Sequence, residues 1–432
     1  MSTSPGSQPS LTAVTVRIDD VGPLIPYIDA KEPLLFVRRG HGIAGVGEAV
    51  RLEFSGPTRM VDAAAAWRSI LSAASIVDPL ELPGTGLVAF GSFAFADESI
   101  ATSVLIVPSV VVGRHGSATW VTRISVAANE QGHAGDGNSH SHAVHEVSAA
   151  GIPPAMPFGP RCAVEFEPGL MTPSAFEGAV DAAISRIEGG SVSKVVLARE
   201  LVGTLSPAAD LRHVLSALEA GYPDCFTFAV NGLIGSSPET LVKVDRGSVS
   251  ARVLAGSMAR GADVAADQEA AVSLATSTKD LDEHGYALRS VLAALGPHSA
   301  SLATTELPFT LKLPNLWHLA SDVEGTLSDG STSLDLVSAL HPTAAVAGAP
   351  TLVALDVIAQ LEPFDRGRYA GPVGWVGSNG DGEWAVALRC AHVSASGRVT
   401  AYAGSGIVTG SVASHELAET RMKFRPIVEA FS

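Results

Sequence analysis

Strand-like segments joined by short turns are the feature that most constrains the fold of this 432-residue chain. Residues 225–231 and 233–244 read as two strands that flank Asn231-Gly232, a dipeptide typical of tight hairpin turns. Further segments of this character are 191–200, 248–257, 371–377, 383–394 and 398–408. Long strand runs with helices between them favour a layered α+β or α/β domain.

Helices are predicted between and around these strands. Thr172 is suited to the N-cap position, Pro173 to the first helical turn, and Gly189-Gly190 to the end of the helix that follows. Further helices are predicted over residues 60–74, over 264–295, before His341, over 350–361 and from Ala413 onward.

The chain changes character along its length. We expect a disordered tail over residues 1–10, short strands with glycine turns over 11–127, and a flexible loop over 128–160, where Gly, Ser, Asn and Pro are frequent. A solvated loop is favoured there over a metal site, although four histidines occur in it. These histidines are His133, His140, His142 and His145. The sharper sequence signals follow in residues 161–432.

The chain is acidic, with 28 Lys and Arg against 44 Asp and Glu and a net charge of −16. A field of this sign repels nucleic acid and anionic membranes, so we expect neither as a partner. It also repels an anionic substrate, which would therefore need a few locally placed cations.

Cysteine content and hydropathy indicate a soluble protein in a reducing compartment, and we expect it to be cytoplasmic. The three cysteines, Cys162, Cys225 and Cys390, are widely spaced, so a disulfide framework is not predicted. The first ten residues lack the basic and apolar regions of a signal peptide. The longest apolar stretch, near residues 100–112, is too interrupted to span a membrane.

Two ionisable residues lie within predicted strands. Lys194 shares a strand face with Val192 and Val196, so it is either an edge-strand lysine that reaches water or a buried general base. Glu239 follows Pro238 and is either an ordinary surface glutamate or a carboxyl kept protonated to act as a general acid.

Carboxylates on two predicted helices suggest a cation site. Glu416, Glu419 and Lys423 lie at positions i, i+3 and i+7, along one helix face. They form either a surface ion-pair ladder or a metal and anion site. Glu283 lies on another helix, where a solvated acidic face is the alternative. Two carboxylates from separate helices would suit Mg²⁺, which prefers oxygen ligands.

Glycines and histidines complete the candidate residues. Gly404, Ser405 and Gly406 precede a predicted helix, where backbone N–H groups can approach an anion closely. His318 and His341 can each be read as a core histidine or as a site residue.

Taken together, residues 191–431 resemble the chorismate-utilising enzymes, a family that includes the isochorismate, salicylate, anthranilate and aminodeoxychorismate synthases. The resemblance is carried by ten motifs in family order. They are SKVVLAR, GSSPETLV, LAGSMARG, KDLDEHGYALR, LWHLASDVEGTL, LHPTAAVAGAP, EPFDRGRYAGPVGW, EWAVALRCA, GSGIV and HELAETRMK. The resemblance implies an α+β fold, a large layered domain of antiparallel sheets covered by helices. Residues 11–127 would be its variable N-terminal half and 161–432 its chorismate-binding region.

The resemblance also implies roles for the candidate residues. Lys194 would activate water, Glu239 would protonate the departing hydroxyl, and Mg²⁺ would be held by carboxylates. The implied metal residues are Glu283 and Glu419, with Glu416 close by. The implied substrate-binding residues are His318, Tyr369, Arg389, Gly404, Ser405, Gly406 and Lys423.

Single positions within the motifs refine the expected reaction. Members of the family that use ammonia lack a lysine at the position of Lys194, and some aminodeoxychorismate synthases carry a lysine where this chain has Ala255. We therefore expect water addition, with isochorismate as the product and salicylate as the alternative. Leu417 and Ala344 depart from the residues common in the family. The resemblance further implies a monomer.

Overall fold

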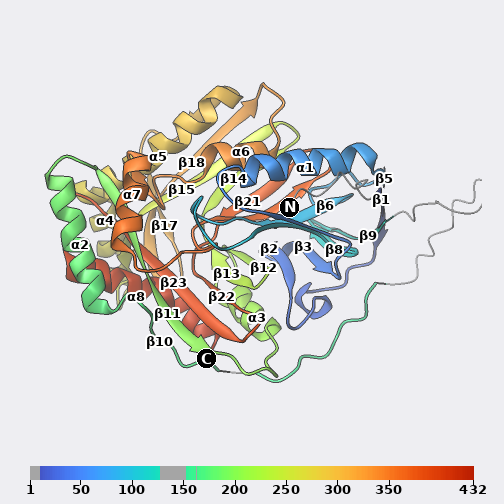
Figure 1. Cartoon of the computed structure of the whole chain (residues 1–432), viewed down its shortest axis with the longest axis horizontal. Coiled ribbons are helices and arrows are strands. Elements are labelled where there is room, and N and C mark those ends of the chain that lie inside the picture. The colour runs from blue at the N-terminus through green and yellow to red at the C-terminus, as the bar shows by residue number, and fades with distance from the viewer. Residues whose placement is uncertain (1–9, 127–151, 162) are drawn as a thin grey trace, which may run out of the picture.

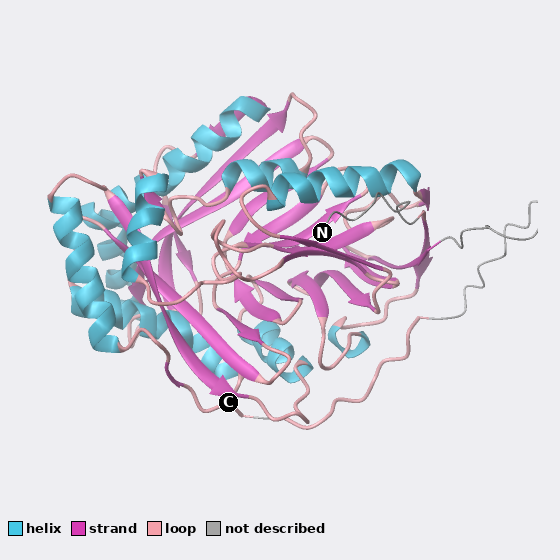
Figure 2. Cartoon of the chain, in the orientation of Figure 1, coloured by secondary structure: helices cyan, strands magenta, loops and turns pink. Residues whose placement is uncertain are grey.

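The computed structural model describes residues 10–126, 152–161 and 163–432. The expected tail, apart from its last residue, lies outside the described residues. So does the expected loop up to residue 151, with all four of its histidines. Two sheets form the middle of the described chain, and helices lie around them (Figures 1 and 2). Among the described residues, every strand pairing but one is antiparallel, so the predicted α+β architecture is confirmed.

The larger sheet has 13 strands and contains most of the predicted C-terminal strands. Its order is β10 (Glu167–Pro168), β11 (Lys194–Thr204), β23 (Arg398–Ile407), β22 (Cys390–Val393), β13 (Leu233–Ser237), β12 (Phe226–Val230), β2 (Leu34–Arg38), β3 (His41–Val46), β8 (Val110–His115), β9 (Ala118–Val126), β1 (Leu11–Ile18) and β5 (Ser75–Val77), with β19 (Gly348–Ala349) beside β11. The predicted hairpin at Asn231-Gly232 is confirmed, because β12 pairs with β13 across this turn. Asn231 has a φ of 51°, which asparagine tolerates well.

The second sheet has 10 strands. Its order is β16 (Ser299–Thr304), β18 (Leu316–Leu327), β15 (Ser248–Ala259), β14 (Thr240–Asp245), β21 (Gly382–Val386), β20 (Pro372–Gly377), β6 (Val88–Ser92), β7 (Ser103–Val107) and β4 (Val50–Phe54), with β17 (Phe309–Lys312) beside β18. One buried cluster joins Phe36 and Phe226 of the larger sheet to Phe90 and Trp384 of this one. The two sheets therefore pack face to face over a shared hydrophobic core.

Helices cover the outer faces of both sheets (Figure 2). They are α1 (Arg59–Ala73), α2 (Pro173–Glu188), α3 (Arg212–Gly221), α4 (Val264–Thr276), α5 (Thr278–Leu295), α6 (Ser333–Leu340), α7 (Thr351–Leu361) and α8 (Ala413–Ala430), with short 3-10 turns η1 (Ile25–Tyr27) and η2 (Gly296–His298). The predicted N-cap of α2 is confirmed, since the Thr172 side chain accepts a hydrogen bond from Ala175 N. The helix predicted over 264–295 is two helices, because the Ser277 side chain caps a new helix by accepting from Asp280 N.

Two predicted strands are divided between the sheets. Residues 233–244 form β13 in the larger sheet and β14 in the smaller, with Pro238 and Glu239 between them. Pro238 has no N–H to donate to a strand ladder, which favours a break there. Residues 383–394 likewise form β21 and β22, and Arg389 between them has a φ of 50°. Within each of these two predicted strands, the chain therefore crosses from one sheet to the other beside a candidate site residue.

These two crossings lie side by side. Val386 N donates to Glu239 O at 3.2 Å, and Ser236 N donates to Arg389 O at 3.2 Å. The hydroxyl of Ser237 also donates to Val386 O at 2.6 Å. Backbone hydrogen bonds therefore hold Glu239 and Arg389 in the same region between the sheets.

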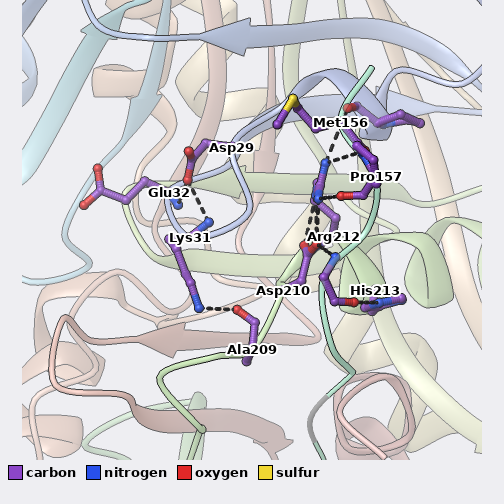
Figure 3. A network of polar contacts seen from close by, with 11 residues as sticks. Asp29, Lys31, Glu32, Met156, Pro157, Ala209, Asp210, Arg212 and His213 are labelled. Atoms are coloured by element: carbon purple, nitrogen blue, oxygen red, sulfur yellow. Dashed lines mark hydrogen bonds and ion pairs between the residues drawn. The ribbon is translucent and has the colours of Figure 1, made fainter. Parts of the chain in front are cut away.

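A network around Arg212 secures the segment 152–161 against the larger sheet (Figure 3). Arg212 forms a buried ion pair of 2.6 Å with Asp210 and donates to the carbonyl oxygens of Met156 and Pro157. Asp210 also accepts from Gly159 N at 2.7 Å. Because the segment's backbone is bound by buried charges, its path over the sheet is well defined.

Candidate active site

A cavity of about 540 Å³, open solvent included, lies where the two chain crossings meet β11, β23, α5 and α8. It is lined by eight of the residues that the sequence singles out. They are Glu239, Glu283, His318, Tyr369, Arg389, Gly404, Gly406 and Lys423. Four others are not in its lining. Lys194 and Glu419 each contact a lining residue, Ser405 lies between two lining glycines, and Glu416 is bound to Ser405. The sequence positions, spread over more than 200 residues, thus converge on one region.

Lys194 is fully buried at the start of β11, between β19 and β23. The interpretation as an edge-strand lysine that reaches water is therefore wrong. Its Nζ atom lies 3.3 Å from Glu283 Oε1 and has no hydrogen-bond partner among the described residues. A buried amine without a hydrogen bond is costly unless a ligand or water supplies one, so this position favours a functional role.

Gly404 and Gly406 lie inside β23, opposite Ala198 and Val196 of β11. The strand predicted over 398–408 is confirmed as β23, which continues to Ile407, and the helix predicted after it begins at Ala413. The structure gives another reason for glycine. A Cβ atom at Gly406 would lie 2.0 Å from Glu283 Oε1.

The same requirement for space applies at Gly404, where a Cβ atom would lie 2.9 Å from Leu197 O and 3.1 Å from the Tyr369 hydroxyl. Ser405, between the two glycines, is buried and donates to Glu416 Oε2 at 2.5 Å. Because the two glycines have no side chains, they leave room for the cavity. Ser405 holds the Glu416 carboxylate of α8 in place by its hydrogen bond.

Glu239 is buried at the first crossing, so the interpretation as a surface glutamate is wrong. Burial raises the pKa of its carboxyl to about 8, although Lys194 and Arg389 partly oppose this shift. The carboxyl is therefore mostly protonated at neutral pH and can donate a proton within the cavity.

His318 and Arg389 form a hydrogen-bonded pair inside the cavity. Arg389 Nη2 donates to His318 Nε2 at 2.8 Å, so His318 Nδ1 carries the hydrogen and lies 3.1 Å from Gly256 O and 3.0 Å from Ser257 Oγ. Burial, together with the charge of Arg389, holds the pKa of His318 well below its ordinary value. The imidazole is therefore neutral and orients the guanidinium of Arg389.

Arg389 is buried and makes no ion pair with any described carboxylate. Its donors beyond the one bound to His318 are free to bind an anion, and a guanidinium can bind a carboxylate through two parallel hydrogen bonds. The Tyr369 ring, which also lines the cavity, stacks on Tyr402 with centroids 5.2 Å apart. Burial raises the pKa of the Tyr369 hydroxyl, which remains a hydrogen-bond donor.

The carboxylates of α5 and α8 are each paired with a lysine. Glu416 accepts from Lys279 Nζ at 2.7 Å, and Glu419 contacts Lys423, whose Nζ donates to Gly404 O at 3.0 Å. Burial and the neighbouring Glu419 raise the pKa of Glu416. Although burial acts to raise it, Lys423 and Lys279 hold the pKa of Glu419 below its usual value.

These carboxylates are therefore neither a solvated acidic face nor a surface ladder. The Lys279 ammonium lies within electrostatic range of Glu283, Glu416 and Glu419 together. No group of three or more metal-ligating side chains converges among the described residues. The buried Glu283 and the partly buried Glu419 nevertheless fit Mg²⁺, which is commonly held by one or two carboxylates while substrate and water oxygens complete its shell.

Three contributors were not singled out from the sequence. Ser257 contacts His318, Lys279 contacts Glu416, and Arg366 lines the cavity. Arg366 is ion-paired with Glu362 at 2.6 Å and donates to Val196 O in β11 at 2.7 Å. The i,i+4 spacing of Glu362 and Arg366 could have indicated an ion pair from the sequence, but this spacing does not show that the pair is buried.

His341 is a core histidine rather than a site residue. Its Nε2 atom lies 2.9 Å from Phe95 O, and its ring meets the Phe95 ring edge-on at 5.7 Å. Burial lowers the pKa of His341 to about 4, so the ring is neutral.

The cavity brings basic and acidic side chains together in a way that suits the binding of a small anion, and comparison with known proteins gives the family. Residues 3–432 match the family of chorismate binding enzymes, and the chain belongs to this family. Isochorismate synthase DhbC of Bacillus subtilis is 40% identical over 270 residues, which cover 60% of this chain and 68% of that protein. The salicylate biosynthesis isochorismate synthase of Pseudomonas aeruginosa is 30% identical over an alignment that covers 98% of this chain and 91% of that protein.

A solved structure gives the same relationship in three dimensions. The crystal structure of DhbC from Bacillus anthracis matches with a TM-score of 0.75 and 30% identity, covering 94% of this chain and 98% of that one.

The described helices include none with the length and apolar character needed to cross a membrane.

Proposed function

We propose that this enzyme converts chorismate into isochorismate, by addition of water at C2 and loss of the C4 hydroxyl. The observation that carries the proposal is the pairing of two groups at one cavity. Lys194 is a buried amine without a hydrogen-bond partner among the described residues, and Glu239 is a carboxyl with a pKa raised to about 8. Relatives that bear the name isochorismate synthase support the same reaction.

Each of these groups moves one proton. The Lys194 amine accepts a proton from the water that attacks C2, and protonated Glu239 donates a proton to the hydroxyl that leaves C4. One water is consumed and one is released, so the product is an isomer of the substrate. A proton returns from Lys194 to Glu239 through solvent before the next cycle. A general acid and a general base contribute about 10²–10⁴ each to the rate.

The substrate is a dianion, and the net charge of the chain is −16. Arg389 and Lys423, which line the cavity, would supply the local positive charge, and His318 and Tyr369 would lie beside the substrate ring. Of these, Arg389 has no carboxylate partner among the described residues, so a substrate carboxylate would satisfy its free donors. Gly404 and Gly406 leave space for the ring along β23.

We further propose that the enzyme uses Mg²⁺. Glu283 and Glu419 would hold the ion, with Glu416 fixed nearby by Ser405 and Lys279. When bound, the ion would supply positive charge to a substrate carboxylate and to the negative charge that develops there. Lys279 lies against Glu416, and Lys423 lies against Glu419.

We also propose that the enzyme acts as a monomer in the cytoplasm. Every residue of the proposed site comes from one chain, so the cavity needs no second subunit for its completion. Size-exclusion chromatography with light scattering tests this statement, and a dimer at micromolar concentration would contradict it.

Chromatographic measurement of chorismate and its products tests the reaction. With Mg²⁺, we expect isochorismate without pyruvate, whereas a stoichiometric yield of pyruvate would indicate salicylate formation. Lys194→Ala and Glu239→Gln should each lower kcat by at least about 10². Lys243→Ala, at a half-exposed lysine of β14, is the matched control. Near-normal turnover in either site variant would exclude the assigned role.

Metal dependence is tested separately. Chelation should abolish turnover and added Mg²⁺ should restore it, while Glu419→Gln should need much more Mg²⁺ for half-maximal activity. Glu429→Gln, on the exposed side of the same helix, is the control and should behave as the unmodified enzyme. Full activity in the presence of a chelator would contradict the proposed metal.

A further inference from the structure

A second cavity shares a wall with the first. It holds about 1870 Å³, open solvent included, and lies where several central strands of the 13-stranded sheet end. Its walls include the turn between β12 and β13 and the turn between β22 and β23, residues 394–397. Arg366, Tyr369 and Ala370 line the first cavity, whereas Arg368 lines the second. The segment 366–371 therefore separates the two.

Arg368 is the unusual residue of this cavity, because it is a buried charge without a counterion. Its exposed fraction is only 8%, and it makes no ion pair with any described residue. Nη2 donates to Asn231 O at 2.8 Å, but Nη1 is buried and has no hydrogen-bond partner among the described residues. Leaving a guanidinium in this state costs stability, and an anion in the cavity would remove that cost.

A second arginine lies close to Arg368. Arg51 pairs with Glu48 at 2.8 Å and donates to the Asn231 side chain at 3.1 Å, so Asn231 connects the two arginines. Burial, and then repulsion by Arg51, lowers the pKa of Arg368 to about 10, and the group remains charged at neutral pH.

The other ionisable groups of the cavity are accounted for. The Lys31 ammonium donates to the carbonyl oxygens of Pro207 and Ala209, and Asp29 accepts from the backbone N–H groups of Lys31 and Glu32 (Figure 3). Burial lowers the pKa of His392 to about 4, so this ring is neutral. Lys31, Arg51 and Arg368 are matched in number by Asp29, Glu32 and Glu48. The formal charges of these groups therefore cancel, so only the unpaired Arg368 is left to bind a single negative charge, and a second charge on the ligand would be repelled by the carboxylates.

We propose that this second cavity binds a small organic carboxylate with an apolar body. The carboxylate would accept hydrogen bonds from Arg368, whose planar guanidinium matches its geometry. The apolar body would lie against Leu34, Ile106 and Val393, which also line the cavity. A phosphate dianion is disfavoured because Glu48, Asp29 and Glu32 are nearby.

The test is a binding measurement that does not depend on turnover. Since Arg389 in the first cavity also attracts carboxylates, the Arg389→Gln protein is the starting point for every titration. Benzoate, acetate and inorganic phosphate are titrated by calorimetry or by ligand-observed NMR. Because no chemical step is measured, the result is independent of whether the enzyme makes isochorismate.

We expect saturable benzoate binding, with acetate and phosphate each weaker by at least about tenfold. Adding Arg368→Gln should raise the benzoate Kd by at least about tenfold, because a charge-assisted hydrogen bond is lost. Adding Arg246→Gln instead, at an arginine that is highly exposed, should leave the Kd unchanged.

Three results would overturn the proposal. They are absence of saturable benzoate binding, binding of acetate or phosphate as tight as that of benzoate, and a benzoate Kd that is unchanged by Arg368→Gln. Thermal melting checks that each protein is folded. Should the Arg368→Gln protein not fold, Arg368→Lys is titrated in its place. Lysine keeps the charge but loses the planar guanidinium, so an unchanged Kd there would equally reject the site.

Discussion

The Nζ atom of Lys194 lies 3.3 Å from Oε1 of Glu283, and both side chains are buried. The same carboxylate occupies the space that a side chain at Gly406 would need. The Glu283 carboxylate of α5 thus lies against both Lys194, the proposed base on β11, and Gly406 on the neighbouring strand β23. The proposed base, the proposed metal residue and the glycine strand therefore depend on one another geometrically.

Gly406→Ala tests this dependence. A Cβ atom would lie 2.0 Å from Glu283 Oε1, so the carboxylate has to move away from Lys194. We expect a loss of about 1–3 kcal/mol in the free energy of unfolding and a fall in kcat of at least about tenfold. Gly178→Ala, on the exposed face of α2 with no atom near the added Cβ, is the control and should be stabilised by about 0.5–1 kcal/mol. Activity of Gly406→Ala equal to that of the unmodified enzyme would contradict the argument.

The pH dependence of activity tests the role of Glu239. Its pKa is raised from 4.5 to about 8 in the folded protein, so the carboxyl is the protonated acid below that pH. We expect kcat/KM to fall as pH rises through about 8, because the acid has lost its proton. A profile that stays flat to pH 9.5 would show that Glu239 is not the general acid.

The same raised pKa predicts a pH dependence of stability. Below pH 4.5 the carboxyl is protonated in both the folded and the unfolded chain, and its stabilising contribution is fully present. This contribution is lost as pH rises from about 4.5 through about 8, because the unfolded chain releases the proton first. Glu239→Gln cannot ionise, so its Tm relative to the unmodified protein should increase over this interval. A difference in Tm that is independent of pH would be the contrary result.

Arg389→Lys tests the anion site. Lysine keeps the charge, but it cannot bind a carboxylate through two parallel hydrogen bonds while also donating to His318. We expect KM for chorismate to rise by at least about tenfold, since one or more charge-assisted hydrogen bonds are lost. Steady-state kinetics measure the change, with Arg425→Lys on the exposed side of α8 as the control. An unchanged KM would remove Arg389 from substrate binding.

Glu362→Gln tests the buried pair beneath the cavity. The Glu362 and Arg366 side chains are 2% and 3% exposed, so the substitution leaves a buried guanidinium unpaired. We expect a loss of about 3–5 kcal/mol in the free energy of unfolding, measured by chemical denaturation. Glu429→Gln breaks an exposed pair and should cost no more than about 1 kcal/mol. Similar effects of the two substitutions would show that burial of the first pair is unimportant.

Local signals in the sequence predicted much of the secondary structure. The N-cap at Thr172 and the turn at Asn231-Gly232 depend on a few neighbouring residues, and both are confirmed. Local signals failed where a strand changes sheet. The strands predicted over 233–244 and 383–394 have uniform character, yet each is divided at Glu239 or Arg389.

By itself, the sequence determined the family, the antiparallel α+β architecture and the set of candidate residues, because each motif is a contiguous run of side chains. Only the tertiary structure decided that Lys194 is buried, that Glu239 is protonated and that Gly404 and Gly406 provide space rather than an anion-binding turn. Burial and proximity are set by contacts between residues about 90 to 210 positions apart, such as Lys194 with Glu283 and with β23. Desolvation, and the pKa it shifts, exists only once those distant segments have come together.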